Sequence, residues 1–237
     1  MSRIPGVVSA IVNSLDDPAQ LGRVQVQFDW MDGAPQSYWA RVAAPMAGSG
    51  RGAFFMPELN DEVLVSFDQG DVSSAYIVGY CWSSADKPPF SANLKQRGIQ
   101  SVLGHQFIMD DDPQTNKITL TTPNNGYALT LDAQNEKITV VTEAGVSVEL
   151  DDPAAGGPQI SLTLPTGDGV VLNATGLNIT IATGTLNVTA LSATITAPSV
   201  TIDAAATTIT GVLTVAGPVI AGGVVSPTYT EGVGNFL

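Results

Sequence analysis

The sequence predicts an all-β protein in which a small N-terminal barrel is followed by an intertwined homotrimeric β-helix, a narrow needle made of three chains. Apolar and polar residues alternate with the period of a strand along most of the chain, and no window repeats apolar residues at helical spacing. The 24 glycines and 15 prolines lie mostly between the alternating runs, as turn residues should. The last hundred residues contain no lysine or arginine. Each strand in this segment has one apolar face that a single chain cannot bury. This favours stacking on further copies of the chain.

The barrel is predicted from the first ninety residues. They contain all three tryptophans and most of the phenylalanines. Five short strands with aromatic filling suit a closed barrel of the oligonucleotide/oligosaccharide-binding (OB) shape. Lys87-Pro88-Pro89-Phe90 ends this unit, because consecutive prolines cannot continue a hydrogen-bonded ladder. We therefore expect the OB-fold barrel over residues 1–90, with strands at residues 6–12, 22–29, 38–43, 62–67 and 75–80.

A weak internal repeat follows the barrel. Its copies begin at Gly104, Gly126 and Gly145, and a degraded copy begins at Gly169, with spacings of 22, 19 and 24 residues. Each copy contains a strand, an acidic turn, a second strand and a glycine turn. Repeats of this period indicate stacking of the solenoid kind. We expect a linker over residues 91–103 and an upper β-helix over residues 104–175.

The repeat shortens in residues 176–215, which predict a narrow β-helical shaft. Strand centres follow one another every seven to nine residues. Such short strands bury little in one chain, whereas three chains wound about one axis would point their apolar faces at a shared centre. Three interleaved chains advance about 14 Å per strand, so five strands would span roughly 70 Å. The predicted trimer core of the shaft comprises Leu177, Ile179, Ile181, Leu186, Val188, Ile195, Val200, Ile202 and Ile209.

The last segment, residues 216–237, leaves this rhythm. Tyr229 and Phe236 are the only aromatic residues after Tyr127. A terminal repeat is expected to be atypical, because it must cap an otherwise open stack. The segment is therefore expected to form the apex of the needle, with Tyr229 and Phe236 as candidates for binding a tip protein.

Composition excludes several classes of partner. The formal net charge of −13, which a trimer would triple, argues against nucleic acid, because binding of phosphates depends on lysine and arginine. It also argues against attachment to anionic lipid headgroups. The single cysteine, Cys81, excludes an intrachain disulfide, and its apolar context predicts a buried thiol. We expect synthesis in the cytoplasm without a signal peptide and without a membrane-spanning helix.

An ordered set of short motifs in the barrel region resembles a known family, the OB-fold domain of phage baseplate assembly protein V and of type VI secretion VgrG spikes. The run Gly104-His105-Gln106-Phe107 and the residues after it are similar to the start of the β-helical shaft in such spikes. Residues 176–215 resemble such shafts only in their general alternation of apolar and polar residues. The motif residues of the barrel are Gly22, Arg23, Trp39, Arg41, Arg51, Pro57, Glu58, Asp61, Glu62, Gly70 and Asp71.

The resemblance implies a homotrimeric central spike in the baseplate of a phage, a tailocin or an extracellular injection system. The barrel would face a hub protein, and the needle would pierce the target envelope and contact its membrane transiently when the sheath contracts. We do not expect the muramidase domain that some of these spikes carry. His105 is the only histidine, so we also do not expect the iron-binding His-X-His tip of many phage spikes. The apex would be capped by Tyr229 and Phe236 or by a tip protein of the PAAR-repeat kind, and a cargo protein is a further possible partner.

Neither catalytic residues nor cofactor or metal sites are expected. His105 lacks a positioned nucleophile, so a packing or hydrogen-bonding role is favoured. The acidic runs at residues 110–112 and 151–152 precede prolines and lack a calcium-loop spacing, which indicates solvated turns. Glu58, Asp61 and Glu62 fall at a turn rather than forming a glycosidase pair. The arginines of the motif set, Arg23, Arg41 and Arg51, are expected to form ion pairs between barrels or to contact the hub.

Two alternatives remain open from the sequence. A trimeric tailspike that degrades polysaccharide would need aromatic sugar platforms, yet residues 137–228 contain no aromatic residue. An OB-fold nucleic-acid binder would use Trp39 and Arg41 as a stacking surface, which the acidity of the chain disfavours.

Overall fold

The computed structural model describes residues 4–28, 30, 38–90, 93–153 and 156–222. It divides into two units, residues 1–186 and 187–237. The described residues contain sixteen strands and one short 3-10 turn, η1 (Pro123–Asn125), and they contain no α-helix. No helix in this described part is long and apolar enough to cross a membrane. The prediction of an all-β protein is confirmed.

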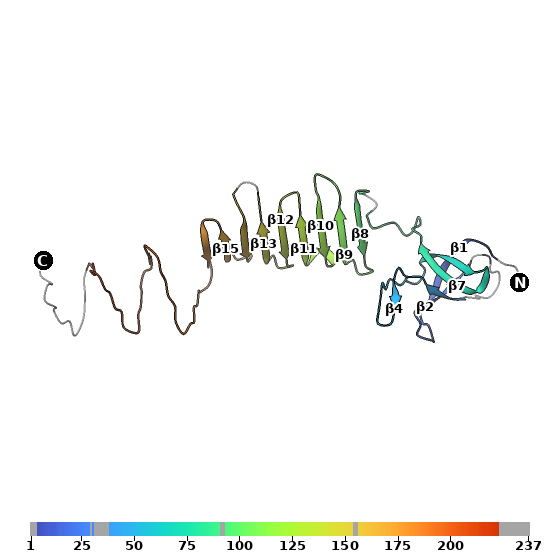
Figure 1. Cartoon of the computed structure of the whole chain (residues 1–237), viewed down its shortest axis with the longest axis horizontal. Coiled ribbons are helices and arrows are strands. Elements are labelled where there is room, and N and C mark those ends of the chain that lie inside the picture. The colour runs from blue at the N-terminus through green and yellow to red at the C-terminus, as the bar shows by residue number, and fades with distance from the viewer. Residues whose placement is uncertain (1–3, 29, 31–37, 91–92, 154–155, 223–237) are drawn as a thin grey trace. The chain divides into compact units, whose positions relative to one another are not determined.

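The N-terminal part is a closed five-stranded barrel with the order β1-β2-β3-β7-β6 (Figure 1). All pairs are antiparallel except the parallel pair β3–β7. A small hairpin of β4 (Ala47–Gly48) and β5 (Arg51–Gly52), which was not predicted, follows β3. The five barrel strands confirm the predicted ones to within a few residues. They are β1 (Val7–Ser14), β2 (Arg23–Gln27), β3 (Tyr38–Val42), β6 (Glu62–Asp68) and β7 (Asp71–Tyr80).

The barrel core is filled by the inward residues of alternating strands. Val24 and Val26 on β2 are fully buried, and their neighbours are not, as expected for a strand with one buried face. Phe28 fills the centre and stacks on Trp30 with ring centroids 4.7 Å apart. Cys81 is half-buried, so the prediction of a buried thiol was wrong.

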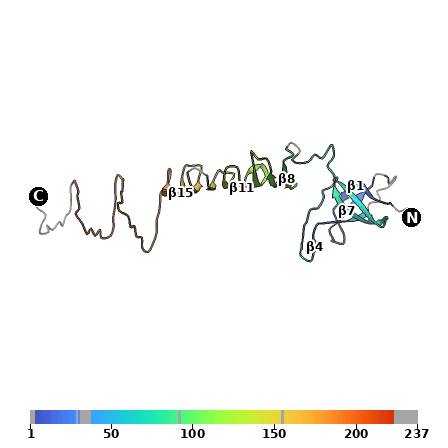
Figure 2. The same cartoon turned by 45° about the horizontal axis from the view of Figure 1, so that its top comes forward.

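The second part of the first unit is a nine-stranded antiparallel sheet in which strands follow one another in chain order (Figures 1 and 2). Its first strand, β8, lies within the segment 91–103 that the sequence suggested as a linker. The later strands match the repeat, two strands to each copy. The strands are β8 (Gln96–Gln100), β9 (Gln106–Asp110), β10 (Lys117–Thr121), β11 (Ala128–Asp132), β12 (Lys137–Val141), β13 (Ser147–Asp151), β14 (Gln159–Thr163), β15 (Gly169–Asn173) and β16 (Gly176–Thr180).

The loops of the sheet fall into two sets, one at each edge. At the glycine edge, formed by the loops 101–105, 122–127, 142–146 and 164–168, tight turns dominate. In one of them Thr142 N donates to Val146 O, and Gly145 N donates to Thr142 O. Gly145 has φ +82°, the left-handed conformation that such short hairpin loops require. At the charged edge, formed by the loops 111–116, 133–136, 152–158 and 174–175, acidic residues are concentrated.

Residues 181–222 contain no strand, although the structure describes all of them, and every one is exposed (Figure 1). The expected strands centred at Val188, Ile195, Ile202 and Ile209 therefore have no pairing partner within the chain. In residues 96–180, by contrast, strand pairing lies within one chain, so interleaving with other chains can apply only to the later segment.

Candidate assembly interface

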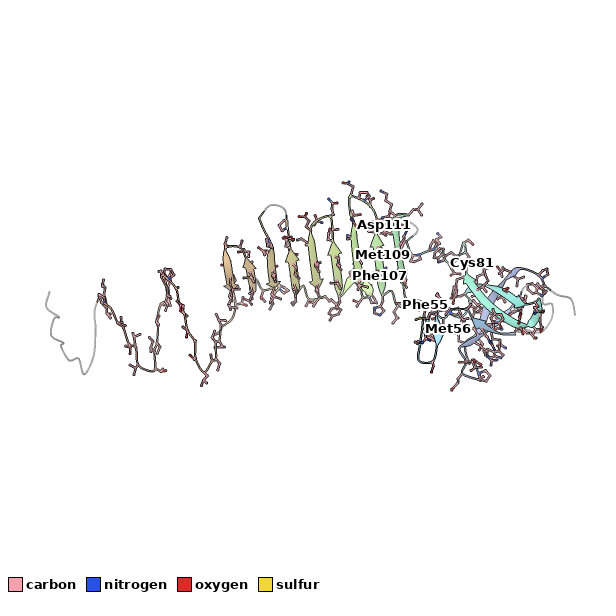
Figure 3. The ribbon with its side chains drawn as sticks, viewed as in Figure 1. Phe55, Met56, Cys81, Phe107, Met109 and Asp111 are labelled. Atoms are coloured by element: carbon pink, nitrogen blue, oxygen red, sulfur yellow. The ribbon has the colours of Figure 1, made fainter. Side chains whose placement is uncertain are left out.

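One face of the nine-stranded sheet carries two rows of apolar side chains. The strand register places them side by side, because every strand contributes its second and fourth residues to this face. Figure 3 shows two of them, Phe107 and Met109, along β9. From β8 to β16 the first row is Arg97, Met109, Ile118, Leu131, Ile138, Leu150, Ile160, Leu172 and Leu177, and the second row is Ile99, Phe107, Leu120, Leu129, Val140, Val148, Leu162, Val170 and Ile179.

These rows are not covered in the single chain. Leu131 is 41% exposed and Leu150 is 44% exposed, although both lie in the middle of a regular sheet. Complete burial of such a side chain is worth about 1.5–3 kcal/mol. Large contiguous apolar surfaces of this kind mark sites of protein association. The apolar face is therefore a candidate interface for assembly.

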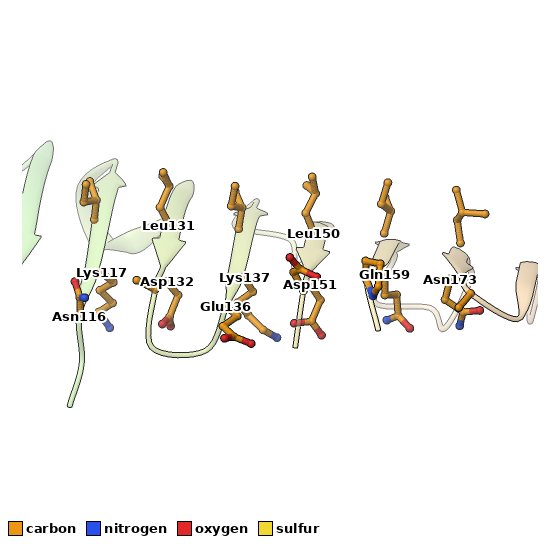
Figure 4. Close-up of a pocket in the computed structure, with 18 residues that line it drawn as sticks. Asn116, Lys117, Leu131, Asp132, Glu136, Lys137, Leu150, Asp151, Gln159 and Asn173 are labelled. Carbon is orange, nitrogen blue, oxygen red and sulfur yellow. The ribbon is translucent and has the colours of Figure 1, made fainter. Parts of the chain in front are cut away.

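Six residues of the first row, from Ile118 on β10 to Leu172 on β15, form the floor of a trough of about 1080 Å³ beside the charged edge. In Figure 4, Leu131 and Leu150 project from their strands, while Asp132, Lys137 and Asp151 lie at the strand ends. A second trough of about 580 Å³ runs beside the glycine edge over Phe107, Leu120, Leu129 and Val140. Both troughs therefore have an apolar floor, but the residues at their edges differ: they are charged in the first and mostly uncharged in the second.

The opposite face carries a ladder of alternating charge. In register, Asp110 lies beside Lys117, Lys117 beside Asp132, Asp132 beside Lys137, and Lys137 beside Asp151. Opposite charges across strands favour this register over a slip by two residues, which the repeating apolar pattern alone would tolerate. The ladder therefore complements the apolar rows in setting the strand pairing.

Two members of the ladder have shifted pKa values, to which the ladder charges add after larger effects of other neighbours. Lys137 Nζ lies 2.8 Å from a carboxylate oxygen of Glu149, and this contact, followed by the nearby carboxylates of the ladder, raises the pKa of Lys137. Hydrogen bonds from Asn135, and then the charge of Lys117, hold the pKa of Asp132 below its ordinary value.

Asp110 is not the solvated turn residue that the sequence suggested. It is only 5% exposed, and it accepts hydrogen bonds from Asp112 N, Gln96 Nε2 and Thr115 Oγ1, each at 3.1 Å. These donors, the backbone one first, lower the pKa of Asp110. Asp112 pairs with Lys95 at 2.8 Å, and Asp111, at the end of β9 (Figure 3), pairs with Arg97. No cluster of potential metal ligands occurs among the described residues.

Arg23 of the barrel forms an ion pair within its own chain. Its Nη2 lies 2.7 Å from Asp17 Oδ1 of the same chain, and its guanidinium lies 5.6 Å from the centre of the Trp39 ring. The hydrogen bonds from Arg23 hold the pKa of Asp17 well below its ordinary value. The predicted contact of Arg23 with another barrel or with the hub stays a prediction. Arg41 lies 5.9 Å from the Tyr76 ring centre within the chain.

The other barrel motif residues build turns. Asp61 Oδ2 accepts a hydrogen bond from Glu58 N at 2.8 Å, and Glu62 accepts one from Ser9 at 2.9 Å. Asp61 and Glu62 both line a small pocket of about 340 Å³, together with Tyr80, Trp82 and Lys87. Gly22 and Gly70 have φ of +68° and +81°, which explains glycine at both turns. Pro57 is fully buried, Asp71 accepts hydrogen bonds from Ser73, and Arg51 folds back over its own hairpin against Gly48.

His105 is exposed, and its backbone N–H donates to Ser101 Oγ at 3.0 Å. The serine hydroxyl therefore supports a turn and is not held by the imidazole as a nucleophile would be.

The residues predicted for the shaft core and the tip remain predictions. Tyr229 and Phe236 lie outside the described residues. In the single chain the shaft residues are all at least two-fifths exposed, so the chain does not bury them by itself. Their exposed fractions are 60% for Leu177, 48% for Ile179, 40% for Ile181, 58% for Leu186, 76% for Val188, 77% for Ile195, 57% for Val200, 69% for Ile202 and 54% for Ile209.

Sequence reasoning missed the apolar rows on β8 to β15, since it named core residues only from Leu177 onward. The shared register of the repeat copies would have revealed them, because each copy places apolar residues at the same two positions of both strands.

Comparison with known proteins agrees with the fold. Residues 8–82 match the family of type VI secretion system/phage-baseplate injector OB domains. The chain is 34% identical over 88 residues to the type VI secretion system spike protein VgrG1a of Pseudomonas aeruginosa, which covers 35% of this chain and 14% of that protein. It is 26% identical over 121 residues to VgrG2a of the same organism, which covers 46% of this chain and 14% of that protein. A match of 34% identity over 86 residues to the actin cross-linking toxin VgrG1 of Vibrio cholerae covers 8% of the toxin.

These comparisons confirm the resemblance inferred from the sequence: the barrel matches the family of injector OB domains, and the chain is similar to VgrG spikes. The match spans about one seventh of the length of the two spike proteins. The named relatives include components of type VI secretion machinery.

Proposed function

We propose that this chain is one subunit of a homotrimeric central spike in the baseplate of a contractile tail, of a phage, a tailocin or an extracellular injection system. The observation that carries the proposal is the uncovered apolar face, which runs across nine strands of a chain whose barrel is an injector OB domain. Such a face requires further copies, and the family resemblance favours three.

The energetics support an assembly that is obligate. Seventeen of the eighteen positions in the two rows are apolar, and most of these side chains are still about 40–50% exposed. If assembly completes their burial, each contributes about 1 kcal/mol, which amounts to on the order of 15 kcal/mol per chain. The segment 181–222, which has no strand pairing of its own in the structure, would gain its hydrogen bonds at the same time.

The proposed role is mechanical and non-enzymatic. Residues 1–90 form the barrel that faces the hub, β8 and residues 104–175 form the upper part of the needle, and residues 176–215 form its narrow part. The segment 216–237, with Tyr229 and Phe236, binds a tip protein of the PAAR kind or caps the apex. Sheath contraction drives the needle through the target envelope, with transient contact to its membrane, and the spike carries cargo where a cargo protein binds it.

The assembly state tests this proposal directly. Sedimentation equilibrium and native mass measurement of the full chain should give a trimer that does not dissociate on dilution. A stable, folded monomer would contradict the proposal. An image of the native particle would then place the barrel against the hub and identify any protein at the needle tip.

Neither alternative function is favoured. Incubation with host polysaccharide should release no reducing ends, and single-stranded nucleic acid should not bind at any salt concentration. Release of reducing ends would support the tailspike enzyme. Salt-dependent binding of single strands would support the nucleic-acid binder.

A further inference from the structure

An acidic pocket lies at one end of the barrel, where β6 begins and β7 ends. Its volume is about 340 Å³, and its carboxylates are those of Asp61, Glu62 and Asp86. Cys81 N donates to Glu62 O at 3.2 Å, and this bond holds the chain after β7 against the start of β6. Ser83 N donates to Asp86 O at 3.0 Å, which closes the turn that carries Asp86. The acidic pocket is therefore built by the fold of a single barrel.

The charge of the acidic pocket is not balanced by its own residues. Lys87 is the one cation among the residues that line it, and Lys87 forms no salt bridge in the part of the chain that the structure describes. Asp61 and Glu62 each use one carboxylate oxygen for a hydrogen bond within the barrel. Three carboxylates against one ammonium group leave the pocket negative, which favours a cationic ligand.

Aromatic side chains lie beside these carboxylates. Trp82 is 70% exposed and Tyr80 is 48% exposed, and both line the acidic pocket. Tyr80 OH donates to Phe55 O at 2.9 Å, so Phe55, which is 59% exposed, lies next to the pocket. Figure 3 shows Phe55 and Cys81 at the same end of the barrel. Aromatic residues are enriched at protein interfaces, where they fill well-packed centres.

We propose that the acidic pocket receives an arginine side chain of a partner protein, with apolar residues of that protein on either side of the arginine. A guanidinium group is planar, so it can stack on the Trp82 ring while its N–H groups donate to carboxylates such as that of Asp86. The apolar neighbours of the arginine would cover Trp82 and Phe55. A volume of about 340 Å³ is at the lower end for ligand pockets, which suits one side chain.

Other ligands fit the acidic pocket less well. A neutral sugar can stack on an exposed tryptophan, but it leaves the negative charge of the pocket unbalanced. Nucleic acid would bring phosphates toward three carboxylates, which like-charge repulsion opposes. The inference of an arginine goes beyond the proposed function, because every group in it belongs to one barrel and none depends on the trimer.

Fluorine NMR of the full chain labelled with 5-fluorotryptophan tests this pocket. The chain contains three tryptophans, so Trp30 and Trp39 serve as internal references, and W82F identifies the signal of Trp82. The probe is a capped tripeptide with arginine between two leucines. The matched control peptide carries citrulline, the neutral isostere of arginine, in the same position. Both titrations are run at the same ionic strength.

The arginine peptide should shift the Trp82 signal saturably, and the citrulline peptide should not. Asp86→Asn should weaken binding of the arginine peptide about fivefold, as loss of a partly exposed ion pair does. Asp68→Asn makes the same change at the other end of β6 and should leave binding unchanged. No shift of Trp82, equal shifts with both peptides, or equal losses in both variants would overturn the proposal.

Two further measurements separate the remaining explanations. Saturable binding of N-acetylglucosamine in place of the arginine peptide would assign the acidic pocket to glycans and overturn the proposal. Native mass of the same samples reports the assembly state independently. A trimer that does not bind the arginine peptide refutes only the arginine pocket, whereas a monomer that binds it refutes only the proposed function.

Discussion

Replacement of Leu131 by aspartate should abolish assembly of the spike, while the same charge on the neighbouring residue should not. Leu131 lies in the middle of the first apolar row, with Ile118 and Ile138 beside it across the two adjacent strands. Thr130 precedes it on β11 and points to the opposite face, where its cross-strand neighbours are threonines. Thr130→Asp is therefore a matched control that introduces the same charge one residue away.

The magnitude follows from burial. Leu131 is 41% exposed in the single chain, so its removal forfeits about 1 kcal/mol of burial on assembly. An unpaired carboxylate taken into a closed interface costs about 3–5 kcal/mol more. Three copies around one axis raise the total to about 10 kcal/mol or more, and each 1.4 kcal/mol changes an equilibrium constant about tenfold. Association should therefore weaken by roughly seven orders of magnitude or more on this basis.

Sedimentation velocity at micromolar concentration is the assay. Leu131→Asp should sediment as monomer or aggregate, and Thr130→Asp should sediment as the trimer of the parent chain. Trimers of equal stability in both variants would refute the reasoning, because the apolar face could not then be the buried interface. Loss of assembly in both variants would show a fault in strand folding instead, which circular dichroism of the control would reveal.

Three further predictions concern ion pairs and the end of the sheet. Asp17→Asn should lower the melting temperature of the barrel, which tryptophan fluorescence can follow. The pKa of Asp17 is depressed from 3.8, so its contribution to stability is present above that value and fades as the pH falls through the lower folded pKa. The melting temperatures of variant and parent should therefore converge in acid. Lys137→Gln should destabilise the sheet less at high salt than at low salt. The pKa of Lys137 is raised from 10.5, so its contribution to stability persists below that value and is lost as the pH rises through the folded pKa. A charge exchange between Lys137 and Glu149 should restore the stability that Lys137→Gln loses. Asp168 accepts hydrogen bonds from two backbone amides just after β16, and Asp168→Asn should speed hydrogen exchange of those amides while leaving β14 protected; unchanged exchange would contradict the contact.

The barrel was the most predictable part of the chain. Its strands have one buried face each, so the alternation of residues such as Val24 and Val26 with polar neighbours is read directly from the sequence. The hairpin of β4 and β5 was missed because its strands have two residues each, too few to show any alternation. β8 was missed because its sequence, Gln96-Arg97-Gly98-Ile99-Gln100, contains one apolar side chain and a glycine.

The candidate interface was only partly predictable. Apolar positions can be read from the sequence, but the exposed fraction of each side chain depends on which strands lie next to each other in the fold. The internal pairing of Arg23 with Asp17 was missed for a related reason: a loop brings the carboxylate to the start of β2, and the sequence distance alone does not distinguish this partner from one on another barrel. Asp110 was misjudged because it is buried and accepts hydrogen bonds from Gln96 on the neighbouring strand β8 and from Thr115 in the loop that follows β9.

The all-β class, the barrel, the repeat and the expected need for partner chains could be inferred from the sequence, because the period-two alternation and the lack of lysine and arginine after Lys137 are local properties of the chain. The pairing of strands within the chain, its end at Thr180 and the two unlike edges beside one apolar face became visible in the fold. The physical reason is that strand register and side-chain exposure are set by neighbours that are distant in the sequence, and these become visible only when the hydrogen-bonded strands lie side by side.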